Sequence, residues 1–194
     1  MGDLLGTGLS AAGLFAGTDV DDLIVLTLMF LAARATGTPR PWQIWAGQYL
    51  GIAVLVAGSA AAALGLALVP DRWVPLLGLV PIGIGLWQLV GAVRHDADDD
   101  ERPPTAAGVL PVAGITIANG ADNIAVYTPM FRTIGAADSV VVVAVFAVMV
   151  AVWCAAAAWL GSHRAIVAAV SRWGHWIVPV VFIALGGWIL SGLR

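Results

Sequence analysis

The chain has 194 residues, of which 60% are hydrophobic and only 11% are charged, and its mean hydropathy is +0.94. This apolar share exceeds that of soluble domains, so the sequence predicts an integral membrane protein. The formal net charge of −3 indicates no nucleic-acid partner, and the single cysteine, Cys154, excludes an intramolecular disulfide and a multi-cysteine metal site.

Six apolar segments follow one another along the chain. The opening sequence MGDLLGTG carries an acid where a secretory signal carries positive charge, so we take Met1 as the mature start. A helix needs about 20 apolar residues to cross a bilayer. Because period-2 alternation is absent and lipid cannot satisfy an open backbone, we expect helices and not barrel strands. The predicted spans are residues 7–33, 42–68, 73–93, 106–131, 138–160 and 174–193.

One charged, proline-rich stretch, RHDADDDERPPT at residues 94–105, divides the chain almost in half. It separates a first unit, 1–93, from a second, 106–194. We interpret its acidic run as a solvated cytoplasmic linker, and a metal-gathering role for it stays open.

The two halves are related by a shift of 101 residues, which lays DVDDLIVLTLMF on GADNIAVYTPMF. Asp21 then falls on Asp122, and Asp22 falls on Asn123. The third and sixth spans align at the same shift, whereas the second and fifth need a small slip. Three helices per copy is an odd number, so the second copy must enter the membrane from the opposite side. The predicted fold is therefore an all-α membrane protein with six transmembrane helices in two inverted three-helix repeats.

The arginines set the predicted orientation. Six of the nine lie in alternate connections, and the other three lie on the opposite side. By the positive-inside rule both termini are outside. The cytoplasmic group is Arg34, Arg40, Arg94, Arg102, Arg164 and Arg172, against Arg72, Arg132 and Arg194.

The aspartates within the first and fourth spans predict a cation site. A carboxylate in mid-membrane costs roughly 2.5 to 3.5 kcal/mol on insertion scales, so a cluster of them needs a strong offset. Residues three and four apart share a helix face, which groups Thr18, Asp21 and Asp22.

The same spacing groups Asn119, Asp122 and Asn123 in the second half. Inverted symmetry would bring the two groups together at the repeat interface. Asp19 can lean toward the first group, and Gly17, Gly120, Pro111 and Pro129 would let the helices break and expose carbonyl oxygens.

Some polar residues of the spans fit simpler roles. Hydrogen-bonded helix contacts would account for Thr18, Asn119 and Asn123 alone, but not for four intramembrane aspartates. Gln48 and Tyr127 can support the site or only pack. Cys154 is a soft donor that can bind metal, although a lone membrane cysteine is usually a packing residue.

Several motifs together resemble a known family. They are TDVDDLIVL, GQYLGI, GLVPIGIG, TIANGADNIAVYTPMF and VPVVFIALGGWIL. They are similar to the cadmium resistance transporters of the CadD family, within the lysine exporter superfamily. The resemblance implies export of Cd²⁺, with Zn²⁺ as a further substrate, across the bacterial cytoplasmic membrane. It carries metal-binding roles to Asp21, Asp22, Asn119, Asp122 and Asn123.

Other functions stay open beside this one. Carboxylate and amide oxygens suit harder ions such as Mn²⁺, and the superfamily also exports amino acids; an organic cation is a further alternative. An intramembrane aspartyl protease would use Asp21 and Asp122 as its pair, but NGADN lacks the second glycine of Gly-x-Gly-Asp. We therefore expect no enzyme, no catalytic residue and no resident cofactor.

The energy source is inferred from a missing motif. The sequence has no phosphate-binding Gly-x-x-x-x-Gly-Lys-Ser/Thr loop, so we expect proton antiport. The partners expected are the divalent ion and the lipid bilayer, and homo-oligomerisation stays open.

Overall fold

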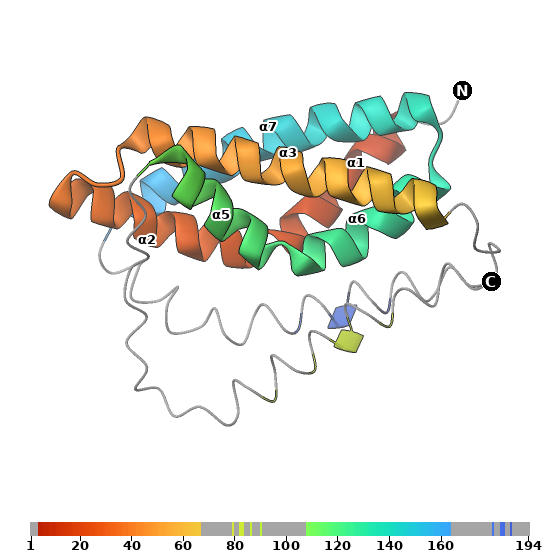
Figure 1. Ribbon diagram of the computed structural model, residues 1–194, viewed down its shortest axis with the longest axis horizontal. Helices are drawn as coiled ribbons and strands as arrows, with labels where there is room; N and C mark the ends of the chain where they lie inside the picture. Colours follow the sequence, from red (N-terminus) through yellow and green to blue (C-terminus); the bar gives the residue numbers. More distant parts are fainter. Residues whose placement is uncertain are drawn as a thin grey trace.

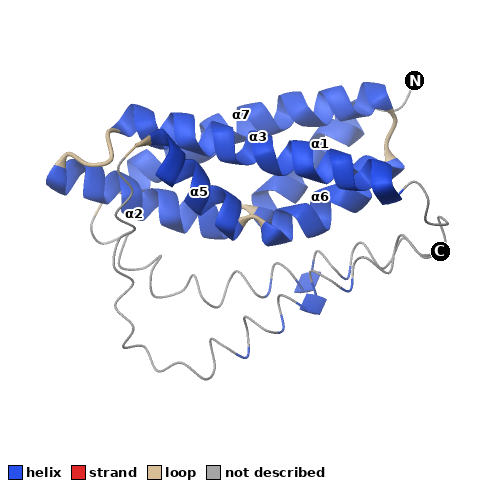
Figure 2. Ribbon diagram, viewed as in Figure 1, coloured by secondary structure: helices blue, strands red, loops and turns tan. Residues whose placement is uncertain are grey.

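The computed structural model describes residues 4–66 and 108–163, together with isolated helical positions in the two remaining stretches. All regular structure in these residues is α-helical (Figure 2), which confirms the predicted class. The helices are α1 (Leu4–Thr18), α2 (Val20–Thr36), α3 (Pro41–Leu66), α5 (Val109–Asn119), α6 (Ala121–Thr133) and α7 (Ala136–Leu160).

Two unbroken helices, α3 and α7, match the predicted spans 42–68 and 138–160. Both are long and apolar enough to cross a membrane, and the bent pair α5–α6 is a third candidate if it counts as one span. The described residues thus contain two or three candidate spans. The third and sixth predicted spans lie outside the described residues, except for isolated helical positions, and so does the acidic linker.

The first and fourth predicted spans are each broken into two helices. The first break is at Asp19, between α1 and α2, and the second is at Gly120, between α5 and α6. At the second break the chain bends by 73°. Gly120 was expected to break its helix, but the first break falls at Asp19 and not at Gly17, which stays helical. Asp19 and Gly120 are equivalent under the 101-residue shift.

The broken pairs run in opposite directions through the bundle, and so do α3 and α7 (Figure 1). Each unbroken helix lies alongside the broken pair of the other half of the chain. Along α3, Gly47 faces Val112 and Gly51 faces Thr116, and then Leu55 meets Gly120. In the same way α7 packs along α1 and α2. The Trp153 indole N–H donates to the Asp19 carbonyl oxygen, and Gly161 lies against the backbone of Thr27 and Leu31.

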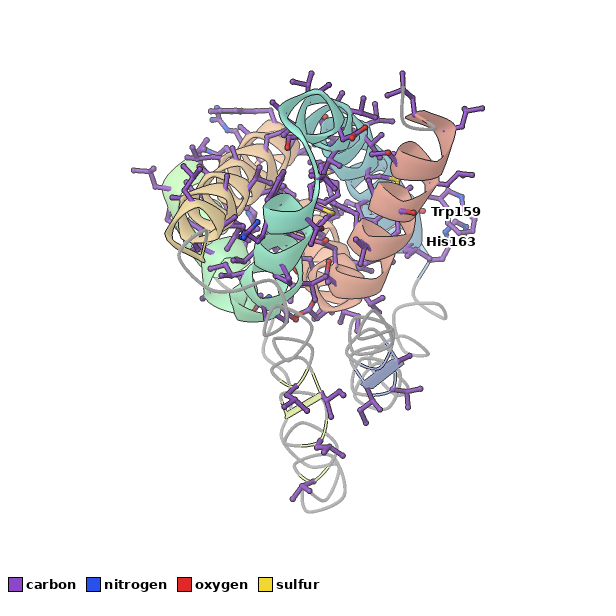
Figure 3. All side chains as sticks on the ribbon, turned by 90° about the vertical axis from the view of Figure 1, so that its right-hand side faces the viewer. Trp159 and His163 are labelled. Atoms are coloured by element: carbon purple, nitrogen blue, oxygen red, sulfur yellow. The ribbon has the colours of Figure 1, made fainter. Side chains whose placement is uncertain are left out.

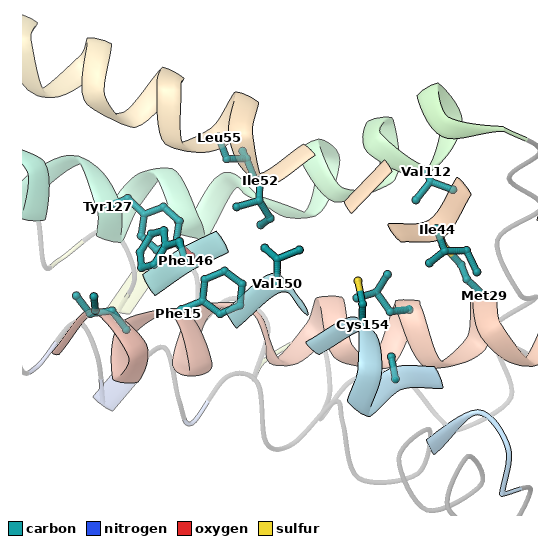
Figure 4. Close-up of a cluster of buried hydrophobic side chains, with 14 of the residues drawn as sticks. Phe15, Met29, Ile44, Ile52, Leu55, Val112, Tyr127, Phe146, Val150 and Cys154 are labelled. Atoms are coloured by element: carbon teal, nitrogen blue, oxygen red, sulfur yellow. The ribbon is translucent and has the colours of Figure 1, made fainter. Parts of the chain in front are cut away.

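Aromatic and aliphatic side chains fill the space between these helices (Figure 4). The ring of Phe146 lies 5.3 Å from Phe15 and 4.6 Å from Tyr127. This cluster joins α1, α6 and α7 at the end of the bundle where α1 and α6 lie. The polar side chains at the two helix breaks therefore have apolar neighbours.

The close approach of α3 and α5 predicts that Gly47→Ala destabilises the protein. A Cβ at residue 47 would lie 2.5 Å from Val112 and 2.9 Å from the Val109 carbonyl oxygen, so the helices must separate. We expect a loss of about 1–3 kcal/mol in unfolding free energy, measured by thermal unfolding in detergent.

Gly58→Ala in the same helix is the matched control, because a Cβ there meets nothing within 4 Å. Removing a helical glycine should stabilise it by up to about 1 kcal/mol. Equal effects of the two substitutions would contradict the tight α3–α5 contact.

Candidate functional site at the paired helix breaks

Asp21 and Asp122 hold the two breaks open in the same way. The Oδ1 atom of Asp21 accepts the backbone N–H of Asp22 at 2.8 Å, and Oδ1 of Asp122 accepts that of Asn123 at 2.7 Å. In a continuous helix these amides would donate to the carbonyls four residues earlier, those of Thr18 and Asn119. The carboxylates therefore replace one helical hydrogen bond at each break and release the equivalent carbonyl oxygen.

Asp21 and Asp122 also lie close enough for their charges to interact. Asp122 is buried, and each residue is in the first turn of its helix, where the helix dipole favours negative charge. No side chain of the described residues donates a hydrogen bond to either carboxylate, and none forms an ion pair with it. The two breaks thus bring together a pair of acids whose only hydrogen-bond donors are backbone amides.

Asp22 is held by neutral side chains from both halves of the chain. Its Oδ2 accepts Gln48 Nε2 at 2.7 Å, and its Oδ1 accepts Asn119 Nδ2 at 3.4 Å. The other end of Gln48 accepts the Thr116 hydroxyl at 2.6 Å. Helices α2, α3 and α5 are therefore joined through one carboxylate.

Asp19 has the most hydrogen-bond partners of the four aspartates. It is fully buried, and its Oδ2 accepts the Tyr127 hydroxyl at 2.8 Å and the Thr18 hydroxyl at 3.1 Å. Its Oδ1 accepts Asn123 Nδ2 at 3.1 Å, and its carbonyl accepts Trp153 Nε1 at 2.7 Å. From the sequence, Asp19 was expected only to lean toward the first group of polar residues. Because the residue is itself the break, its side chain is instead enclosed between both halves.

The structure gathers the predicted polar residues at the two breaks. Thr18, Asp19, Asp21 and Asp22 lie at the first, and Asn119, Gly120, Asp122 and Asn123 at the second. Gln48 and Tyr127, predicted as supporting residues, are hydrogen-bonded to these aspartates.

Two further residues of the site were missed by the sequence analysis. Thr116 lies three residues before Asn119 and so on its helix face, a signal that could have identified it. Trp153 gave no such signal, because one indole of an apolar helix resembles another in sequence.

The oxygen atoms at the breaks are not arranged as a finished metal cage. No three His, Cys, Asp or Glu side chains of the described residues are close enough together to hold an ion. The Asn123 Oδ1 atom, however, is buried without a hydrogen-bond partner. A cation between Asp21 and Asp122 would draw the carboxylates together and satisfy such an acceptor.

Cys154 belongs to the buried apolar cluster shown in Figure 4. It lies close enough to Asp22 for that charge to act on the thiol. This position allows a soft donor beside the site, but no described residue forms a hydrogen bond with the thiol.

At the end of α7, Trp159 and His163 lie on the outside of the bundle (Figure 3). Their ring centroids are 5.0 Å apart, and Trp159 is exposed. Amphipathic rings at a helix end are typical of a membrane interface, so this pair is separate from the helix breaks.

Comparison with known proteins identifies the family. A family model described as cadmium resistance transporter matches residues 15–192, a range that contains both breaks and all the aspartates described above. No curated protein and no solved structure matched the chain. The family is one of transporters and not of enzymes. The long apolar helices of this chain fit a membrane protein. The chain belongs to the cadmium resistance transporter family.

Proposed function

We propose that the protein exports divalent metal cations, Cd²⁺ first and Zn²⁺ second, from the bacterial cytoplasm in exchange for protons. One observation carries this proposal: Asp21 and Asp122 lie at equivalent helix breaks, near enough for their charges to interact, and within the described residues only backbone amides donate to them. A divalent cation between them would offset both charges in an apolar setting.

Further oxygen atoms at the two breaks are available as ligands. Asn123 Oδ1 is an unsatisfied acceptor, and the breaks release the carbonyls of Thr18 and Asn119. Oxygen ligands bind Cd²⁺ more weakly than thiolates do. Because an exporter must release its ion, such a site suits transport better than a closed thiolate cage. The same donors make Mn²⁺ the alternative to Cd²⁺ and Zn²⁺.

The packing supports two inverted repeats. Equivalent helices run in opposite directions (Figure 1), the breaks fall at equivalent residues, and each unbroken helix supports the other half's broken pair. In transporters this arrangement places the substrate at the repeat interface near the membrane midplane. A tilt of one half against the other would then open the site to either side in turn.

Proton exchange follows from the same pair of acids. Without a cation, two adjacent carboxylates in an apolar bundle repel each other unless a proton is bound. An arriving divalent ion displaces protons, because metal ligands bind in deprotonated form. Each transport cycle would carry metal outward and protons inward.

We predict that Asp21→Asn and Asp122→Asn each weaken metal binding and efflux by at least about tenfold. For binding, a tenfold change corresponds to about 1.4 kcal/mol of binding free energy. Each change removes a charge and nearly preserves shape, so membrane yield should persist. The measurement is Cd²⁺, Zn²⁺ and Mn²⁺ flux in inverted vesicles, with and without a pH gradient. Asp138→Asn, in the first turn of α7 and outside both breaks, is the control. Normal flux in both site variants would contradict the symmetric site.

Asp19 should respond differently to charge loss and to truncation. In Asp19→Asn the Thr18 and Tyr127 hydroxyls can exchange donor and acceptor roles, so folding should persist. Asp19→Ala removes the acceptor of the buried Asn123 amide and leaves a space beside Thr18 and Tyr127, whose hydroxyls keep each other as partners. It should therefore cost about 1–3 kcal/mol of stability. Thermal unfolding of both variants checks this, and equal stability of the two would refute the hydrogen-bonding role.

Orientation can be tested with two alanine-to-cysteine variants in a Cys154→Ala background. Ala35 and Ala137 are exposed near opposite ends of the bundle. We expect an impermeant thiol reagent to label Ala35→Cys from the cytoplasm and Ala137→Cys from outside. The reverse labelling would invert the topology derived from the arginines.

A further inference from the structure

Gln48 connects the two halves of the chain at the edge of the candidate metal site. It lies on α3, is 1% exposed, and uses both ends of its amide. Nε2 donates to Asp22 Oδ2 at 2.7 Å, and Oε1 accepts the Thr116 hydroxyl at 2.6 Å. A neutral amide thus satisfies a buried carboxylate.

This hydrogen bond competes with a cation. The N–H of Gln48 points at the oxygen that a metal on Asp22 would use, and a donor hydrogen and a cation repel each other. Metal binding at Asp22 therefore requires the amide to leave or to turn. A half-turn about the last side-chain bond exchanges nitrogen and oxygen while nearly preserving the shape of the group.

Thr116 has the hydrogen-bonding capacity that such a turn needs. Its hydroxyl has a second acceptor, the Val112 carbonyl at 3.4 Å. Once the hydroxyl hydrogen points there, Oγ1 can accept from the turned Nε2 of Gln48. Each hydrogen bond that the turn breaks is replaced by another hydrogen bond or by the cation, so the turn leaves none of these groups without a partner.

The backbone around Gln48 is fixed while its amide is free to exchange ends. Gly47 and Gly51 on either side bring α3 into close contact with Val112 and Thr116 of α5. Any separation of these helices would lose both contacts. The response to a cation is therefore confined to the amide and the threonine hydroxyl.

We propose that Gln48 is a switchable ligand of the transported ion. In the empty transporter its amide nitrogen donates to Asp22, and in the loaded transporter its Oε1 binds the cation that Asp21 and Asp122 hold together with Asp22. The inference rests on the proposed metal-transport function and adds a neutral ligand from α3 to that site. When the transporter is empty, the Asp22 carboxylate thereby keeps a hydrogen-bond donor. When it is loaded, the bound ion gains a further oxygen ligand.

Infrared spectroscopy tests the switch directly. The chain contains three glutamines, Gln43, Gln48 and Gln88, so Gln43→Ala with Gln88→Ala leaves one side-chain label. The protein is labelled with ¹³C at the glutamine side-chain carbonyl, and difference spectra are taken between Cd²⁺-loaded and empty states. We expect the labelled carbonyl band to shift to lower frequency on loading, because the oxygen exchanges a hydroxyl donor for a metal.

Calorimetry on the same protein separates the two levels of the account. If Cd²⁺, Zn²⁺ and Mn²⁺ all fail to bind, both the proposed function and the switch are wrong. If a metal binds and the labelled band does not move, the switch alone is overturned.

Two substitutions give an independent measurement. Once ionised, the side chain of Gln48→Glu cannot donate to Asp22 and adds a charged oxygen, so Cd²⁺ should bind about tenfold more tightly at a pH that keeps it ionised. Gln48→Leu removes the oxygen, so binding should weaken about tenfold. Gln43→Leu is the control, because Gln43 accepts the Arg40 backbone N–H at the exposed start of α3. Unchanged affinity in Gln48→Glu, the variant that keeps the shape of the side chain, would show that residue 48 does not reach the ion.

Discussion

The structure depends on the burial of carboxylates in an apolar bundle whose described residues form no ion pair with them. A buried charge without a cation is unfavourable unless hydrogen bonds compensate it. Asp19 and Asp22 meet this requirement with neutral donors, most of them from the other half of the chain. Asp122 is buried and Asp21 partly so, and within the described residues only backbone amides donate to them, so their charges are the least compensated. Such incomplete compensation is expected where a cation binds transiently.

The helix breaks follow from this constraint. A carboxylate that accepts the next residue's amide removes that amide from the helical ladder, and the helix ends. The same interaction occurs at Asp21 and at Asp122, so both spans break at equivalent residues. The two helices that begin there direct the positive ends of their dipoles at the acids. The unbroken α3 and α7 compensate for the lost continuity, since each packs along the broken pair of the other half.

Much of this arrangement was predictable from the sequence, because it depends on local pattern. Apolar length gave the α3 and α7 spans within two residues of their observed ends, and the 101-residue shift paired Asp21 with Asp122 before any contact was known. The central place of Asp19 was not predictable, since it results from donors on α6 and α7 that lie more than a hundred residues away. The hydrogen bond from Thr116 to Gln48 also depends on the close packing of α3 and α5. Gly47 and Gly51 allow this packing, but two glycines in an apolar helix do not predict it.

The central claim is that one transported ion binds between the two breaks. Anomalous diffraction from crystals of the Cd²⁺-loaded protein tests it most directly, because the signal locates the ion without assumptions about its ligands. The account predicts a single intramembrane peak within about 2.6 Å of oxygen atoms from both Asp21 and Asp122, a distance typical of large divalent ions with oxygen ligands. A peak at Cys154 without either carboxylate, or one confined to the acidic stretch at residues 95–101, would contradict it.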